Sequence, residues 1–246
     1  MAMHAEQDFP WYDDRPVALA WADWIIVLAA LAIGFVFLVS PLLPAIVGQR
    51  WAPVLAPLLF VAVPLGALVW RAGPSWRRIS NGFRWSYVGW GVAIGVLNIL
   101  VTIAIGLIAI KTMPLSHNAV VEGLSGGAAP GALVQFYMLS AVQLFGEELF
   151  TILPFLFLLW LGTKHLGLSR HHAVLLGWIG SALLFGAIHL PTYGWNIAQA
   201  VLLIGTVRLV LMLAYLRTKS IWASTIAHIV NDWWAFTLAI LAGGTA

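Results

Sequence analysis

Long apolar runs, separated by short polar segments, account for most of the chain. Each run has about 20 residues, enough for a helix to cross a bilayer. The runs lack the alternation of membrane β-strands, so they are read as helices. We predict an all-α fold, a polytopic transmembrane helix bundle of about seven to eight helices, forming one integral membrane domain over 1–246. The predicted spans are roughly 22–40, 53–71, 85–110, 133–163, 173–190, 197–216 and 220–242.

Composition supports an integral membrane protein. The 246 residues are 62% hydrophobic and 9% charged, whereas soluble domains carry about 25% charged residues. The 14 tryptophans suit a protein with two bilayer interfaces. The net charge of +3 indicates no nucleic-acid partner. The absence of cysteine excludes disulfides and thiol chemistry.

Basic residues predict the orientation of the spans. Arginines and lysines concentrate near Arg15 and in the segments 71–84, 164–172 and 217–219, whereas the alternate loops hold only Arg50 and Lys111. With seven spans, the richer segments fall on one side, which the positive-inside rule places in the cytoplasm. We therefore expect a prokaryotic inner-membrane protein with a cytoplasmic N-terminus. The acidic N-terminus lacks the basic region of a signal peptide, so we expect no cleavage there.

Three features outside the polar motifs have structural interpretations. The Gly- and Ala-rich segment 111–130 predicts a flexible loop, partly re-entrant in one interpretation. Gly91 and Gly95 form a small-xxx-small pair, which is typical of close helix packing rather than chemistry. The cluster His165, His171 and His172 is interpreted as polarity at the level of the lipid headgroups.

Glu147 and Glu148 are the only acids between Glu122 and Asp232. A carboxylate at membrane depth costs about 2.5–3.5 kcal/mol on insertion scales, so such residues indicate a functional site by default. The two side chains point about 100° apart on a helix, so one can face a cavity while the other contacts a neighbouring helix. Alternatively, both are held by a buried arginine, for which Arg208 is the candidate inside a span.

Two further polar groups interrupt the later spans. His189 lies four residues after Phe185, and His228 lies three residues before Asn231 and four before Asp232. These spacings place each set on one helix face. The alternative for the second set is an interhelical hydrogen bond that only stabilises the bundle. With straight, perpendicular helices, His189 and His228 would differ in depth by more than ~10 Å, so convergence requires tilted or broken helices.

Together these groups form a candidate hydrolytic site. Glu147 could accept a proton from water as general base, with His189 holding the water. His228 and Asn231 could donate hydrogen bonds to the developing oxyanion. No serine or cysteine nucleophile is required.

The order EELFTI, FGAIH, HIVN resembles the CAAX-protease and bacteriocin-processing family (CPBP, or Abi), the Ras-converting-enzyme-like intramembrane glutamic endopeptidases. The family pattern is EExxxR, then FxxxH, then HxxxN or HxxN, and the resemblance covers about 133–235, with 1–132 as N-terminal helices and a loop. By resemblance, Glu147 activates water with His189, Glu148 supports it, and His228 with Asn231 forms the oxyanion hole. Ile152 stands where the family carries its arginine.

The resemblance implies a protease that needs no cofactor and cleaves a membrane-anchored peptide or protein close to the lipid bilayer. Three alternatives remain open. Glu147, His189 and His228 could bind zinc in a metalloprotease. The chain could be a non-catalytic membrane partner or bacteriocin-immunity protein, which the missing arginine favours. The acids and histidines could instead relay protons in a transporter.

Overall fold

The computed structural model describes residues 8–116 and 130–243, and every regular element in these ranges is helical. The elements in chain order are α1 (Trp21–Val39), α2 (Leu42–Val47), α3 (Ala52–Ala72), the 3-10 helix η1 (Gly73–Ile79), α4 (Trp85–Thr112), α6 (Pro130–Lys164), α7 (Arg170–Ile188), the π-helix η2 (Gln199–Ile204), α8 (Gly205–Thr218) and α9 (Ile221–Gly243). The predicted helical bundle is therefore confirmed.

Six segments of the described chain are long and apolar enough to cross a membrane. They correspond to the first six predicted spans, with α3 and η1 counted together and η2 joined to α8. The seventh predicted span is the 23-residue helix α9. It is not among the six. α9 is one continuous helix.

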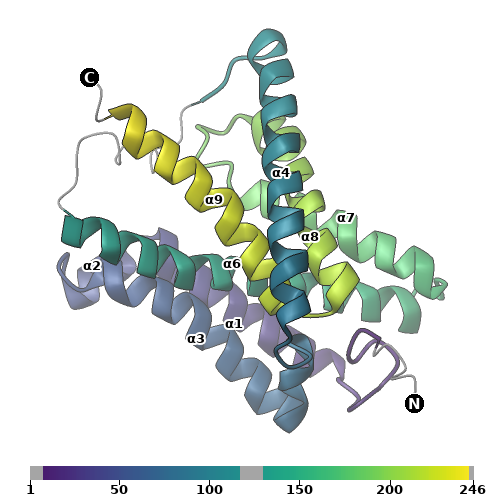
Figure 1. Ribbon diagram of the computed structural model, residues 1–246. Helices are drawn as coiled ribbons and strands as arrows, with labels where there is room; N and C mark the ends of the chain where they lie inside the picture. Colours follow the sequence, from purple (N-terminus) through teal and green to yellow (C-terminus); the bar gives the residue numbers. More distant parts are fainter. Residues whose placement is uncertain (1–7, 117–129, 244–246) are drawn as a thin grey trace.

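The helices cross at steep angles (Figure 1). In that view α4 stands upright, α9 runs diagonally, and α6 lies across both. α6 is the central element: 72% of its most apolar window is buried, compared with 22% for α4. One large cluster of buried side chains surrounds α6, drawing on α1, α3, α7, α8 and the N-terminal segment, with Leu149, Leu153 and Phe155 fully buried. Apolar residues on all sides of α6 explain why it occupies the middle of the bundle.

α4 packs closely against α9 through its two small residues. A Cβ atom built on Gly91 would lie 2.7 Å from Ile226 Cβ, and one built on Gly95 would lie 2.8 Å from the Ala227 carbonyl oxygen. Only glycine allows this approach, so the predicted packing role of the pair is confirmed. The close approach holds α9 against α4 through the turn that precedes His228.

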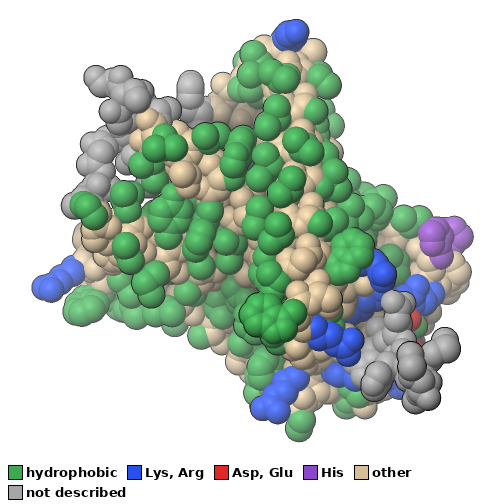
Figure 2. Space-filling model, viewed as in Figure 1, with side chains coloured by type: hydrophobic (Ala, Val, Ile, Leu, Met, Phe, Trp, Pro, Cys, Tyr) green, Lys and Arg blue, Asp and Glu red, His purple; other side chains and the backbone are tan. Residues whose placement is uncertain are grey.

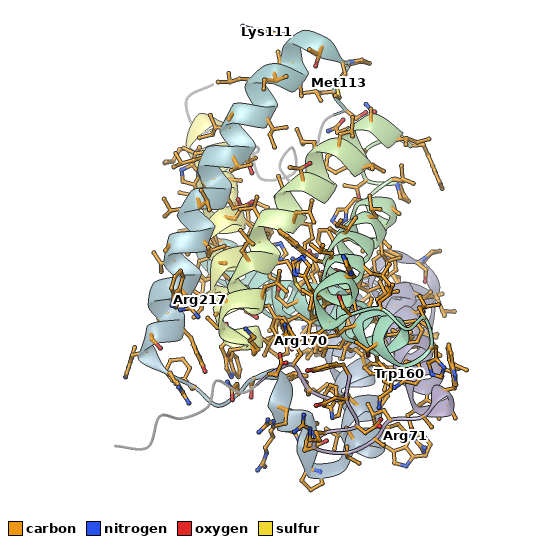
Figure 3. The ribbon with its side chains drawn as sticks, turned by 90° about the vertical axis from the view of Figure 1, so that its right-hand side faces the viewer. Arg71, Lys111, Met113, Trp160, Arg170 and Arg217 are labelled. Carbon is orange, nitrogen blue, oxygen red and sulfur yellow. The ribbon has the colours of Figure 1, made fainter. Side chains whose placement is uncertain are left out.

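Basic side chains gather at one end of the molecule. In Figure 2 most of them lie at the lower right, with others at the top and far left, while hydrophobic side chains cover much of the remaining visible face. Figure 3 places Arg71, Arg170 and Arg217 toward this end and Lys111 at the opposite tip. The segments predicted to share one side of the membrane therefore do lie together. Of the predicted loop 111–130, residues 117–129, including Glu122, lie outside the described residues.

Candidate active site

Four helices bring the polar residues of the apolar spans together. Glu147 and Glu148 come from the middle of α6, Phe185 and His189 from the end of α7, and Arg208 from α8. His228, Asn231 and Asp232 come from α9. The steep tilts of these helices remove the depth difference expected for straight ones, and His189 and His228 line the same cavity.

Glu148 lies on the side of α6 that faces α8 and α9, and its side chain is completely buried. Its Oε1 accepts a hydrogen bond from Arg208 Nη1 at 2.7 Å and lies 2.8 Å from His228 Nδ1. Its Oε2 accepts a hydrogen bond from the Ser224 hydroxyl. Three donors therefore satisfy the carboxylate, which explains how it is tolerated away from water.

Arg208 supplies the cation that the sequence motif lacks at position 152. Ile152 is fully buried in an apolar environment one turn after Glu148. Arg208 reaches Glu148 from α8, 60 residues away in the chain, and its guanidinium carbon lies 4.6 Å from the centre of the Phe185 ring. The alternative that a buried arginine holds both glutamates is thus correct for Glu148, although not for Glu147.

Glu147 faces in a different direction, and 13% of its side chain is exposed. Gln143, one turn earlier on α6, donates a hydrogen bond to Oε1 at 3.0 Å. Oε2 lies 3.8 Å from His228 Nε2. The expected division of the pair, with one carboxylate facing a cavity and the other a neighbouring helix, therefore holds.

Glu147, His189, Asp232 and Phe236 lie between two cavities of about 230 and 190 Å³ and line both of them. The larger cavity also contacts His228 and Asn231, and apolar residues of α8 and η2 form one of its walls. The smaller cavity extends along α6 past Gln143, Ser140 and Phe136. A small substrate group or several waters fit beside Glu147 in either cavity.

The hydrogen-bond partner of each histidine ring determines which ring nitrogen carries the hydrogen. His189 Nδ1 lies 2.8 Å from the Phe185 carbonyl oxygen, which can only accept, so Nδ1 carries hydrogen. In the neutral ring, Nε2 of His189 is then an acceptor. His228 Nδ1 faces the Glu148 carboxylate at 2.8 Å, so Nε2 of His228 donates only when the ring is an imidazolium.

Asn231 and Asp232 are linked to each other and to α4. Asn231 Nδ2 donates to Asp232 Oδ1 at 2.8 Å, and Asn231 Oδ1 accepts from Asn98 Nδ2 at 2.9 Å. Asp232 Oδ1 also lies 3.6 Å from His228 Nε2. The sequence motif selected Asn231, but Asp232 is the residue that lines both cavities. In the sequence, the four-residue spacing between His228 and Asp232 was the signal that could have identified Asp232 as a site residue.

Among the residues described, no three His, Asp or Glu side chains lie close enough together to hold a metal ion. The separate histidine cluster makes local contacts. His165 lies 4.6 Å from the Trp160 ring, and His172 Nδ1 pairs with the Ser169 hydroxyl at the start of α7.

Comparison with known proteins finds one family that resembles the part of the chain containing this site. Residues 129–234 match the model of the type II CAAX prenyl endopeptidase Rce1-like family. The match includes all the polar site residues named above and excludes α1, α3 and α4. No curated protein and no solved structure is similar enough to this chain to be matched. On this match, together with the order of the motifs, residues 129–234 are similar to the Rce1-like family of CAAX proteases.

Proposed function

We propose that the protein is an intramembrane endopeptidase that hydrolyses a peptide bond of a membrane-anchored substrate with water activated by Glu147. The family indicates protease activity of the CAAX type in general. The observation that carries the specific proposal is the shared cavity, which Glu147, His189, His228 and Asn231 all line. Glu148 does not line this cavity, and its carboxylate contacts Arg208 and His228.

In the first step, Glu147 accepts one proton from a water molecule while the water oxygen attacks the carbonyl carbon of the scissile bond. The neutral His189 ring accepts a hydrogen bond from the same water at Nε2 and orients it. The carbonyl oxygen becomes an oxyanion. A His228 imidazolium donates to it from Nε2, and Asn231 offers its second amide hydrogen, because its first is used by Asp232.

In the second step, the tetrahedral intermediate collapses and the C–N bond breaks. Glu147 returns its proton to the leaving nitrogen, so the products are an amine and a carboxylic acid, which then releases its proton to water. Glu148 and Asp232 support this cycle by stabilising the His228 imidazolium, from which they lie 2.8 and 3.6 Å away. Arg208 removes the main reason for treating the chain as an inactive relative, which was the absence of a cation beside Glu148.

The test is Glu147→Gln in purified protein reconstituted into liposomes with a fluorogenic peptide carried on a lipid anchor. General-base catalysis contributes about 10²–10⁴-fold, so we expect cleavage to fall by at least 10²-fold while the melting temperature stays close to that of the wild type. Asp14→Asn, at an exposed ion pair with Lys164, is the control and should cleave normally. Retained cleavage in Glu147→Gln would overturn the proposal.

The same assay separates the zinc alternative. Glu147-activated water requires no metal, so we expect the rate to be unchanged after treatment with a strong chelator and dialysis. A rate that falls with chelation and returns with zinc would instead favour the metalloprotease.

A further inference from the structure

A second concave site lies at the basic end of the molecule, away from the polar cavities. A groove of about 660 Å³ runs between residues 16–17 of the N-terminal segment and the junction of α3 with η1. Its lining includes Trp70, Arg71, Ser75 and Arg78. The groove therefore combines apolar surface with two guanidinium groups, and it lies at the end of a predicted membrane span.

The two arginines of the groove differ in how they are paired. Arg71 Nε donates to Asp23 Oδ1 at 2.6 Å, and its guanidinium lies 4.9 Å from the Trp70 ring. Arg78 is half-buried, and within the described part of the chain no hydrogen bond or ion pair engages it. The Asp23 carboxylate neutralises the charge of Arg71, so the net positive charge of the groove comes from Arg78.

The acids nearest to Arg78 are already bound to other groups. Arg78 also lines a smaller pocket with Asp8, Asp13 and Arg15. Asp8 accepts hydrogen bonds from Arg170, and Asp13 accepts one from Arg15 Nε at 2.8 Å. A half-buried cation without a protein partner fits a site whose anion comes from outside the protein.

The apolar part of the groove identifies the class of anion. The Trp70 side chain is 69% exposed at the last turn of α3, and Val17 across the groove is 38% exposed. An exposed tryptophan beside arginines at the end of a membrane span is typical of the lipid interface. A ligand with a phosphate at Arg78 and hydrocarbon along Trp70 satisfies both parts.

We propose that this groove binds the headgroup of an anionic phospholipid, with Arg78 pairing with the phosphate and Trp70 contacting the glycerol and upper acyl chain. The proposal does not depend on the protease assignment, because none of the groove residues lines the cavities beside Glu147. It gives the bundle a preferred lipid at its basic end.

The test measures lipid binding to the full-length detergent-purified protein by native mass spectrometry, with phosphatidylglycerol and phosphatidylcholine of identical acyl chains. We expect a preference for phosphatidylglycerol, and Arg78→Gln should weaken its binding about fivefold, the effect of one basic residue near the membrane surface. Arg77→Gln is the matched control, because Arg77 stacks on Trp76 and does not line the groove. Arg77→Gln should change the affinity for phosphatidylglycerol by less than about twofold, compared with the fivefold expected for Arg78→Gln.

Three outcomes would overturn the proposal. Equal losses in Arg77→Gln and Arg78→Gln would mean a diffuse basic surface rather than a site. Equal affinity for the two lipids would rule out recognition of the anionic headgroup. Displacement of phosphatidylglycerol by millimolar inorganic phosphate, with no loss in Trp70→Ala, would mean a site for a free anion.

Discussion

Glu148 is held by a long-range contact with a permanently charged side chain. Its carboxylate is completely buried, and Arg208 donates to it alongside Ser224 and the nearby His228 ring. Removing one member of a buried ion pair leaves an uncompensated charge and costs about 3–5 kcal/mol. The pair therefore controls both the stability of the bundle and the position of His228.

Arg208→Met tests this dependence. Methionine keeps much of the side-chain volume but leaves Glu148 without its cation, so we expect unfolding to become easier by about 3–5 kcal/mol. His228 would also lose the fixed carboxylate that orients it, so the rate of cleavage should fall. Both changes can be measured on purified protein, by thermal melting and by the liposome assay.

A double variant separates charge pairing from packing. Arg208→Met combined with Glu148→Gln removes both charges, and we expect it to be more stable than Arg208→Met alone. If the double variant were as unstable as the single one, the loss would come from the packing of Arg208 on Phe185 rather than from the charge.

At this scale the sequence predicts the polar groups that line the cavity better than the residues that support them. Glu147, His189 and His228 follow from polar residues at helical spacing inside apolar runs, and all three line one cavity. The pairing of Glu148 with Arg208 joins residues on α6 and α8. No local spacing encodes such a contact, so the sequence offers Arg208 only as the candidate inside a span.

The α4–α9 contact is where helix packing affects the site. Gly91 and Gly95 let α4 approach α9 within the turns that precede His228 and Asn231. Both glycines are buried against backbone carbonyl oxygens as well as side chains. An added methyl group cannot be absorbed by a rotamer change alone, because a Cβ atom on Gly91 would lie 2.8 Å from the Ala223 carbonyl oxygen.

Gly91→Ala should therefore destabilise the protein by about 1–3 kcal/mol, the usual cost of overpacking, and should lower cleavage by displacing α9. Gly106→Ala is the control on the same helix, because a Cβ there meets nothing within 4 Å. It should be neutral or slightly stabilising, since alanine favours helix. Equal effects of the two substitutions in thermal melting would contradict a packing role for Gly91.

Apolar run length predicts the long helices well, because bilayer thickness sets their length. It does not predict α2, η1 or η2, which are six or seven residues long. These short elements depend on local turns and tertiary contacts. For η2 one such contact is the hydrogen bond that the Ser116 backbone N–H donates to Gln199 Oε1 at 2.7 Å.

Across the whole molecule, the N-terminal segment joins the basic ends of several helices. Phe9 is buried against Phe155 and Tyr215, and Trp11 is fully buried and donates to the Ser75 hydroxyl. Asp8 accepts hydrogen bonds from Arg170 and from the Tyr12 hydroxyl. This segment connects α6, α7 and α8 to η1, although its polar, acidic sequence gave no such expectation.

Asp8 provides a pH-dependent test of this connection. Burial by itself raises the pKa of its carboxyl. Hydrogen bonds from Arg170, Tyr12 and the Phe9 backbone N–H outweigh burial, and the pKa lies below the ordinary value of 3.8. A lowered pKa in the folded state means that the ionised carboxylate stabilises the fold above pH 3.8. This contribution is lost as the pH falls through the lowered value.

Asp8→Asn should therefore melt at a lower temperature than the wild type near neutral pH, and the difference should shrink as the pH falls below 3.8. Arg15→Gln is the control, because Arg15 pairs with Asp13 two residues away and 83% of its side chain is exposed. Such a local surface pair contributes little, so its melting temperature should match the wild type throughout. If the melting temperature of Asp8→Asn were lower than that of the wild type by the same amount at every pH, the ionised carboxylate would not be the group that holds the N-terminal segment against α7.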